Sequence, residues 1–199
     1  RMVPQINLRD QPNQIGRQRV NALLLAAILL LGLGLRVDYA WEGRAPIFDA
    51  SAYATIARNL DEDRGFTLGR AATQPASNYS PGVPLIAAGL YAITGGVHER
   101  LARLALALIG TFAVLFTYLI GRRLAGVTAG LIGAGAVAIY PALLEYQGML
   151  MGEPLAATLL SGAVLAMLWA DGPGARGRWI VPGLLLGALA LVRPEYVAI

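Results

Sequence analysis

Three charged residues in this sequence have the chemistry and the position of a reactive site. Asp49 precedes the stretch ASAYATIARNL, Glu153 opens an apolar run beside Pro154, and Arg193 lies near the end of another such run. Charged groups that persist beside membrane segments usually face protein or water and often serve function, because burying them in lipid costs about 2.5 to 3.5 kcal/mol each. A carboxylate can accept a proton from an attacking hydroxyl, and Arg binds phosphate bidentately. The three together suit a reaction of a lipid phosphate.

Each of these residues also has a purely structural interpretation. Asp49 is a good helix N-cap, worth about 1 kcal/mol. Glu153 suits the positive end of a helix dipole, and Arg193 can extend its charged end to the membrane interface. The surrounding elements decide between these interpretations.

The composition points to lipid as the solvent. The chain has 199 residues, of which 56% are hydrophobic and 14% charged, whereas soluble domains carry about 25% charge. Cysteine is absent, which excludes disulfides and thiolate catalysis, and a single His98 argues against a histidine metal site or triad. The basic residues are all Arg, scattered, with a net charge of only +4, so nucleic acid is not an expected partner.

Apolar stretches of about 20 residues predict membrane-spanning helices. Five stretches come near this length: Val20–Leu35 extended through Val37, Leu101–Ile120, Ala125–Leu144, Met149–Ala170 and Trp179–Ile199. The run Pro84–Ile93 is too short to span. With five spans and a cytoplasmic N-terminus, the following residues all lie inside, as the positive-inside rule requires: Arg17, Arg19, Arg122, Arg123, Arg176 and Arg178.

This topology leaves a long outer loop, residues 38–100, which is longer than a connection needs and therefore expected to be functional. Within it, Asp49 stands at the N-cap of a helix whose spacing places Ala50, Tyr53, Ala54 and Ala57 on one face. A second apolar helix is closed by Gly95–Gly96. We expect both to lie along the outer surface. Gly126 and Gly130, in GxxxG spacing, predict close helix packing.

The fold class predicted is therefore an all-α integral membrane protein. About five transmembrane helices are joined by interfacial helices in the first outer loop. Residues 1–19 are predicted to be a cytoplasmic tail, and residues 20–199 one transmembrane unit.

Five segments in order resemble the N-terminal portion of the GT-C glycosyltransferases, in particular the bacterial protein-mannosyltransferase-like group that includes lipid A aminoarabinose transferases. They are FDASAYATIARNL (an Asp-x3-Tyr-x3-Ala pattern), YSPGVPLIAAGLYAITG, HERLARLALALIGTFAVLFTYLIGRRLAG, YPALLEYQGMLMGEPLA and GLLLGALALVRPEY. The resemblance covers nearly all of residues 20–199. It implies that the chain is part of a longer protein with more spans, so this segment alone is expected to be inactive.

The resemblance implies an inverting enzyme that moves a hexosyl or pentosyl group from a polyprenyl-phosphate donor to a lipid, glycan or protein acceptor. The reaction takes place at the outer face of the cell (inner) membrane. Asp49 matches the family's general base or acceptor-orienting carboxylate. Glu153 matches an acid near the acceptor or a bound metal, and Arg103 and Arg193 match donor-phosphate contacts. Tyr53 and Arg58, within the first motif, complete the expected substrate-binding set.

Two points are left open by the sequence. The sequence identifies no cofactor with certainty, and it leaves open a divalent metal held by Asp49 and Glu153. Ala50 follows Asp49 where many protein mannosyltransferases have Glu, which weighs against a protein acceptor, and Val83 replaces a usual aromatic residue.

The main rival function is a transporter or flippase of a lipid-linked or anionic solute. It is disfavoured because transporters place ionisable groups near the midplane on broken helices. A non-catalytic membrane scaffold that uses the Gly-rich third span is the second rival.

Overall fold

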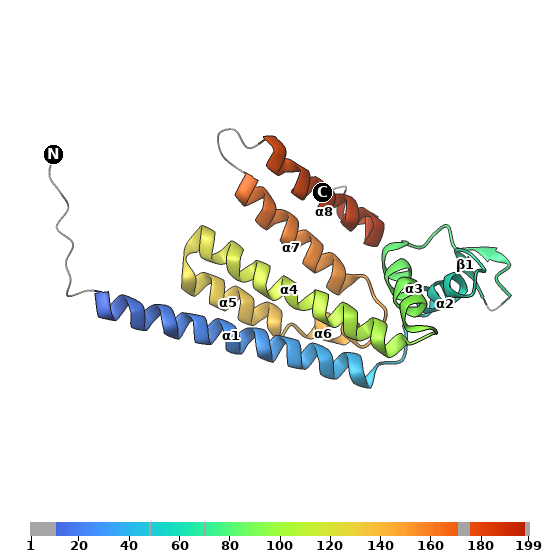
Figure 1. Ribbon diagram of the computed structural model, residues 1–199, viewed down its shortest axis with the longest axis horizontal. Coiled ribbons are helices and arrows are strands. Elements are labelled where there is room, and N and C mark those ends of the chain that lie inside the picture. The colour runs from blue at the N-terminus through green and yellow to red at the C-terminus, as the bar shows by residue number, and fades with distance from the viewer. Residues whose placement is uncertain (1–10, 48, 70, 171–175, 198–199) are drawn as a thin grey trace.

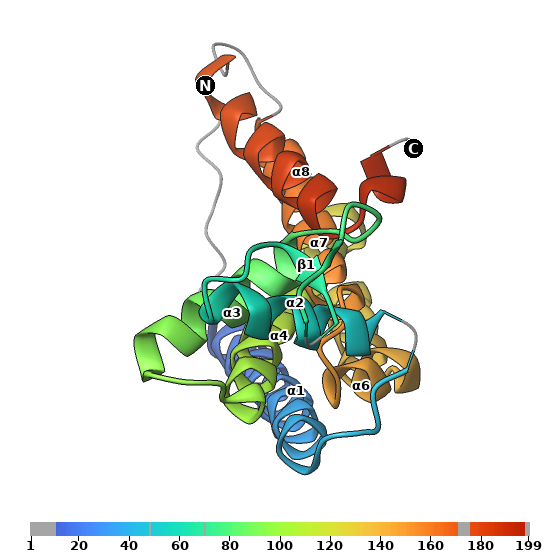
Figure 2. The same ribbon diagram turned by 90° about the vertical axis from the view of Figure 1, so that its right-hand side faces the viewer.

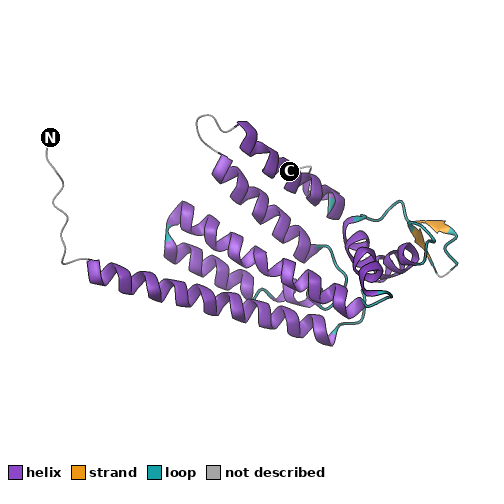
Figure 3. Cartoon of the chain, in the orientation of Figure 1, coloured by secondary structure: helices purple, strands orange, loops and turns teal. Residues whose placement is uncertain are grey.

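Long apolar helices form most of the chain, as the hydropathy pattern predicts (Figure 3). The structure is a computed structural model that describes residues 11–47, 49–69, 71–170 and 176–197. Within these residues a bundle is formed by α1 (Gln11–Glu42), α4 (Glu99–Ala125), α5 (Val127–Ala138), α7 (Glu153–Ala170) and α8 (Ile180–Val192). The first ten residues of the predicted cytoplasmic tail lie outside the described part.

Three of the bundle helices are long and apolar enough to cross a membrane: Gly16–Glu42, Glu99–Ala125 and Glu153–Ala170. They correspond to the first, second and fourth predicted spans. The first helix is longer than predicted, because it continues through Arg36 and Asp38 to Glu42. Glu153 opens α7 with Pro154 in its first turn, as predicted, because a first-turn proline has no amide hydrogen that the helix needs. The total of five spans stays a prediction.

The third predicted span is broken rather than continuous. α5 ends at Ala138, and α6 (Pro141–Gln147) follows after a bend of 47°. Pro141 is the physical cause, because a residue before proline disfavours helical backbone. Tyr140 accordingly adopts an extended conformation, with φ −65° and ψ 113°. Taken together, α5 and α6 pass as one bent span, which would bring the number of candidate spans to four.

The last predicted span is shorter than expected. A 3-10 helix η1 (Arg176–Trp179) leads into α8, whose 13 residues end at Val192, and η2 (Pro194–Val197) follows. Pro194 cannot continue the ladder of helical hydrogen bonds. At 1.5 Å per residue α8 is about 20 Å long, less than the roughly 30 Å of a hydrocarbon core. Residues 198–199 lie outside the described part.

A cap made from residues 50–94 covers one end of the bundle (Figure 1). It contains α2 (Ala50–Asp61), α3 (Gly82–Thr94) and a small antiparallel ladder of β1 (Thr67–Leu68) and β2 (Gln74–Pro75). The two strands are absent from the all-α prediction. Figure 2 looks onto this end, with α2, α3 and β1 toward the viewer. Gly95 closes α3 in the left-handed region at φ 75°, as predicted. Placement of these helices along the membrane surface stays a prediction.

Small residues allow the closest helix contacts. A Cβ on Gly130 of α5 would lie 2.6 Å from the Tyr118 carbonyl oxygen of α4, so only glycine fits there. Gly126 instead forms the turn between α4 and α5 at φ 88°. At the cap, a Cβ on Gly82 would lie 2.6 Å from Val192 Cγ2, which brings α3 against the end of α8. This contact places the residue after α8, Arg193, beside α2.

Candidate functional site

The structure brings the three charged residues singled out in the sequence together in one ion-pair cluster. Arg193 Nη1 lies 3.6 Å from Asp49 Oδ2, and Arg193 Nη2 pairs with Glu153 Oε1. Arg193 Nη1 also lies 3.2 Å from Glu195 Oε1. We call Asp49, Glu153, Arg193 and Glu195 the carboxylate cluster. Its members come from segments about 40 to 145 residues apart, so their meeting is a property of the tertiary fold.

The local backbone explains why these side chains meet. Asp49 occupies the N-cap position of α2, but its side chain makes no capping hydrogen bond. The Asp49 carboxylate is therefore directed to Arg193 rather than to its own helix, which removes the main structural interpretation of this residue. Arg193 follows the last residue of α8 and passes Gly152. A Cβ on Gly152 would lie only 3.3 Å from Arg193 Nε, so this glycine makes room for the guanidinium.

The carboxylate cluster carries a net negative charge. Three carboxylates surround one guanidinium, which gives a formal charge of −2 when all are ionised. Burial acts to lower the pKa of Arg193, but Glu153, Tyr53, Glu195 and Asp49 outweigh it, and the pKa is raised overall. Arg193 therefore stays charged and its charge is fully compensated. A dianionic phosphate gains little from such a site, because the net field repels it.

The carboxylates at the starts of α2 and α7, Asp49 and Glu153, differ in their solvent exposure. The side chain of Glu153 is 21% exposed and that of Asp49 is 39% exposed. Glu153 Oε2 and Arg193 Nε are both buried without a hydrogen-bond partner among the described residues. Glu153 Oε2 is an acceptor and Arg193 Nε is a donor, so the buried part of the cluster has unused hydrogen-bonding capacity. Asp49 is the carboxylate that a ligand can reach, and Glu153 is the one that fixes Arg193.

Tyr53 lies behind the cluster rather than at its surface. It is 1% exposed, and its ring meets Tyr79 edge to face with centroids 6.2 Å apart. Burial raises the pKa of the Tyr53 hydroxyl, Arg193 and a hydrogen bond with Ser80 oppose this, and the acids Asp49 and Glu153 add to it. The hydroxyl stays protonated at neutral pH. In this position Tyr53 belongs to the buried apolar cluster of the cap and holds α2 in place.

The other two predicted substrate-binding residues, Arg58 and Arg103, line a separate cavity of about 180 Å³ together with Arg44. We call it the arginine pocket. Arg58 Nη2 lies 3.2 Å from Glu99 Oε1, and Arg103 Nε donates a 3.0 Å hydrogen bond to the Ala40 carbonyl. Ala50 and Ser51 also line this pocket, immediately after Asp49 in the chain. Glu99 lines the pocket as well, so its charged side chains sum to +2, and the first turn of α2 lies between this basic pocket and the acidic cluster.

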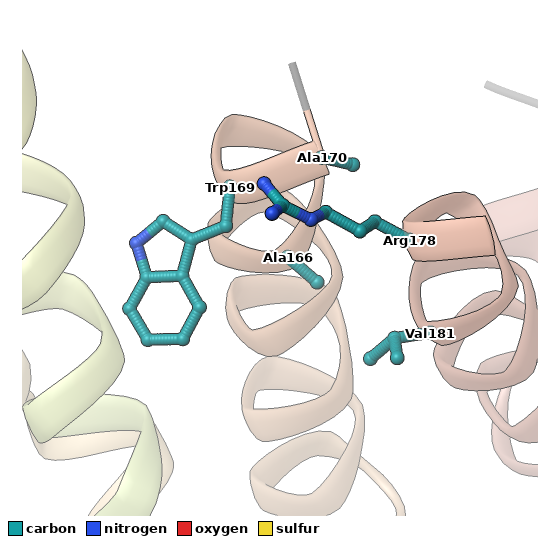
Figure 4. Close-up of a pocket in the computed structure, with 5 residues that line it drawn as sticks. All are labelled: Ala166, Trp169, Ala170, Arg178 and Val181. Carbon is teal, nitrogen blue, oxygen red and sulfur yellow. The ribbon is translucent and has the colours of Figure 1, made fainter. Parts of the chain in front are cut away.

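A second cavity, of about 270 Å³, adjoins the cluster on the side of Glu153. Its walls are aromatic and aliphatic: Tyr140, Tyr146, Tyr196, Ala156, Ala157 and Leu160 contribute to them. Leu160 lies seven residues after Glu153 on α7, so the cavity reaches about 10 Å along that helix. A further cavity, of about 340 Å³, lies at the opposite end of α7 and is lined by Trp169 and Arg178 (Figure 4). It is about 24 Å from Glu153 along the helix and is not part of this site.

A metal does not fit the cluster as it stands. Among the described residues, no group of three or more His, Cys, Asp or Glu side chains comes together in a way that could hold a metal ion. Asp49 and Glu153, the two residues left open as metal ligands, share the Arg193 guanidinium instead. We therefore derive no step through a metal.

Sequence reasoning missed two residues of this region. Glu195 pairs with Arg193, and the signal for it was only its proximity in the chain. Arg36, on α1, is 1% exposed and donates hydrogen bonds to the carbonyls of Gly32, Ala138 and Val137 at 3.0 to 3.1 Å. It satisfies the last carbonyls of α5, where that helix breaks. A single Arg inside an apolar run was the available signal.

The comparison with protein families gives one match. A family model described as dolichyl-phosphate-mannose-protein mannosyltransferase matches residues 75–199. The matched range contains Arg103, Glu153 and Arg193, whereas Asp49, Tyr53 and Arg58 precede it. None of the curated proteins compared with the chain matches it.

Proposed function

The chain belongs to the dolichyl-phosphate-mannose-protein mannosyltransferase family, which makes it a membrane glycosyltransferase of the GT-C type, and from this premise we propose its reaction. A sugar moves from a polyprenyl-phosphate donor to a hydroxyl of a lipid, glycan or protein acceptor, with inversion at the anomeric carbon. Asp49 is the general base. The observation that supports this most is the convergence of Asp49, Glu153 and Arg193 from three distant segments.

The proposed chemistry is a single displacement. The acceptor oxygen forms a bond to the anomeric carbon while the bond from that carbon to the phosphate oxygen breaks. The acceptor proton passes to the Asp49 carboxylate, and polyprenyl phosphate leaves with the bonding electrons. A positioned base contributes about 10²- to 10⁴-fold to such a step. Arg193 is a positioning residue, because its guanidinium fixes Asp49 against Glu153.

We assign the donor phosphate to the arginine pocket rather than to Arg193. The leaving phosphate gains negative charge, and Arg58 and Arg103 can stabilise it. The carboxylate cluster carries a net −2 charge and would repel it. Ala50 and Ser51 line the pocket directly after Asp49, and this adjacency supports a donor whose phosphate lies in the pocket and whose sugar extends toward the base.

The distribution of Arg residues supports an outer-face site. The Arg residues at the start of α1 and the end of α4 lie at the end of the bundle remote from the cap: Arg17, Arg19, Arg122 and Arg123. Under the positive-inside rule this distribution supports a cytoplasmic location for that end and an outer location for the cluster. We propose a multi-pass protein of the inner membrane with a cytoplasmic N-terminus.

Asp49→Asn in the full-length protein tests the proposal, with Asp61→Asn at the other end of α2 as the matched control. Membrane vesicles are supplied with radiolabelled polyprenyl-phosphate hexose and pentose donors. We expect Asp49→Asn to lose at least 10²-fold in transfer while donor binding is kept, and Asp61→Asn to retain transfer. Transfer at the wild-type rate by Asp49→Asn would remove this residue from the mechanism.

One observation favours the rival transporter function. Broken membrane helices are typical of transporters, and α5–α6 is broken beside the buried Arg36. Tyr140, at the break, lines the same cavity as Glu153, so the position of the break does not decide between the two functions. We prefer transfer because the family model that matches residues 75–199 is that of a mannosyltransferase. Directional uptake of a labelled polyprenyl-phosphate sugar into vesicles, with no product formed, would favour the transporter.

A further inference from the structure

A cation and an aromatic ring meet at the cap end of α1 and α4, outside both the carboxylate cluster and the arginine pocket. The guanidinium carbon of Arg100 lies 4.8 Å from the centroid of the Trp41 ring. Trp41 is 57% exposed and Arg100 is also exposed. The neighbouring acid, Glu99, pairs with Arg58. Within the described residues no carboxylate forms an ion pair with Arg100, so its charge faces outward uncompensated.

An apolar cavity of about 300 Å³ lies between the same two helices. It is lined by Leu29, Leu30, Leu33, Leu108, Thr111, Phe112 and Leu115. The hydroxyl of Thr111 donates to the Ala107 carbonyl at 2.9 Å, so the one polar side chain of the lining is already satisfied within its helix.

Helical spacing aligns the cavity with the Arg100–Trp41 pair. On α4 the residues of one face are Arg100, Leu104, Leu108, Thr111 and Leu115, at steps of three or four. On α1 the matching face holds Trp41, Val37, Leu33 and Leu30. Because each residue adds 1.5 Å, the cavity lies about 12 to 22 Å below Arg100 along α4. The Arg100–Trp41 pair and the cavity therefore share one face of the α1–α4 contact, with Leu104 and Val37 between them, and we call this face the α1–α4 groove.

We propose that this groove binds an anionic phospholipid of the membrane leaflet on the Asp49 side. Its phosphate contacts Arg100, and one acyl chain lies between α1 and α4. Arg is suited to phosphate, and Trp is suited to the interface at headgroup level. A volume of 300 Å³ corresponds to roughly ten groups the size of a water molecule, which suits one acyl chain.

This ligand is distinct from the glycosyl donor. Arg103, one turn further along α4, is turned to the Ala40 carbonyl and the arginine pocket, whereas Arg100 is on the outer flank. A lipid held by Arg100 does not present its phosphate to Asp49. The proposed role is structural support of the α1–α4 contact, on which the arginine pocket is built. The proposal does not depend on the reaction proposed above.

The test uses the purified full-length protein in detergent, with phosphatidylglycerol and phosphatidylcholine of identical acyl chains as probes. Native mass spectrometry reports bound lipid, and thermal unfolding reports the stabilisation that binding produces. We expect phosphatidylglycerol to bind about fivefold more tightly. Arg100→Gln should abolish this preference. Arg123→Gln, at the other end of the same helix, is the matched control and should keep it.

A second measurement tests the groove itself by detecting bound lipid directly, so it does not depend on a variant that binds lipid less tightly. A bimane label on Leu108→Cys should be quenched by phosphatidylglycerol brominated on its acyl chain. Equal binding of the two lipids, an unchanged preference in Arg100→Gln, or a label that brominated lipid cannot quench would each overturn the proposal. In the last case a further protein segment covers the groove.

Discussion

Removal of Arg193 is the sharpest test of the site, because one side chain compensates three carboxylates. In Arg193→Met the hydrophobic stem is kept and the charge is lost. Glu153, whose side chain is 21% exposed, then becomes a partly buried carboxylate without a counter-charge. Leaving such a charge costs about 3 to 5 kcal/mol when it is fully buried, so about 2 to 3 kcal/mol is expected here. Asp49 and Glu195 are more exposed and add up to about 1 kcal/mol.

The expected total is therefore about 3 kcal/mol, or an apparent melting temperature lowered by roughly 6 to 12 °C for a chain of this size. The assay is thermal unfolding followed by circular dichroism in detergent, across pH 4 to 8. In the variant, the folded carboxylates repel one another and bind protons more readily than in the unfolded chain. Stability of the variant relative to wild type therefore recovers as the pH falls toward about 4, where unfolded carboxylates titrate.

A double-mutant cycle separates the ion pair from other effects of the substitution. Glu153→Gln together with Arg193→Met removes both charges, and we expect the double variant to be about 2 kcal/mol more stable than Arg193→Met alone. The reasoning fails if Arg193→Met melts within about 1 °C of wild type at pH 7. It also fails if the double variant is no more stable than the single one, or if the deficit does not shrink at low pH.

Three further predictions follow from the geometry. Arg103→Gln should lower kcat/KM for the donor about tenfold, with kcat lowered as well, because the lost charge-assisted contact strengthens as the leaving phosphate gains charge, whereas Arg122→Gln should leave steady-state kinetics unchanged. Arg36→Met should lower stability by about 2 kcal/mol in thermal unfolding, since the last carbonyls of α5 lose their donor, and a melting curve that matches wild type would contradict this. Gly130→Ala should destabilise the α4–α5 contact by about 1 to 3 kcal/mol, because its Cβ would overlap the Tyr118 carbonyl oxygen. Gly135→Ala has open space at its Cβ and should not destabilise the protein. Equal melting temperatures of the two variants would show that α4 and α5 can tolerate a side chain at position 130.

Much of the bundle could be predicted from the sequence, because lipid imposes a simple rule on it. A spanning helix must satisfy its own backbone, so length and hydropathy suffice to locate α1, α4 and α7. The start of α7 was likewise predictable, since Glu153 and Pro154 act within their own first turn. The closure of α3 at Gly95 depends on one residue's freedom to adopt positive φ. Each of these signals is local in the chain.

The break between α5 and α6 was harder to predict from the sequence. Pro141 was visible in the sequence, but apolar composition continued across it and predicted one span. Whether such a proline bends or ends a helix depends on what satisfies the carbonyls it frees. Here Arg36 of α1, about a hundred residues earlier in the chain, donates hydrogen bonds to the carbonyls of Val137 and Ala138. No local pattern links the two.

For the site, the sequence by itself determined which residues had costs that needed explaining: Asp49, Glu153 and Arg193 were singled out because charge beside lipid is expensive. Only the tertiary structure decided that they pair with one another, that Arg193 is compensated, and that Arg58 and Arg103 line a different pocket. The physical reason is range. The cost of desolvating a charge belongs to a residue and its segment, whereas its compensation comes from whichever distant segment the packing of α2, α7 and α8 brings within a few ångströms.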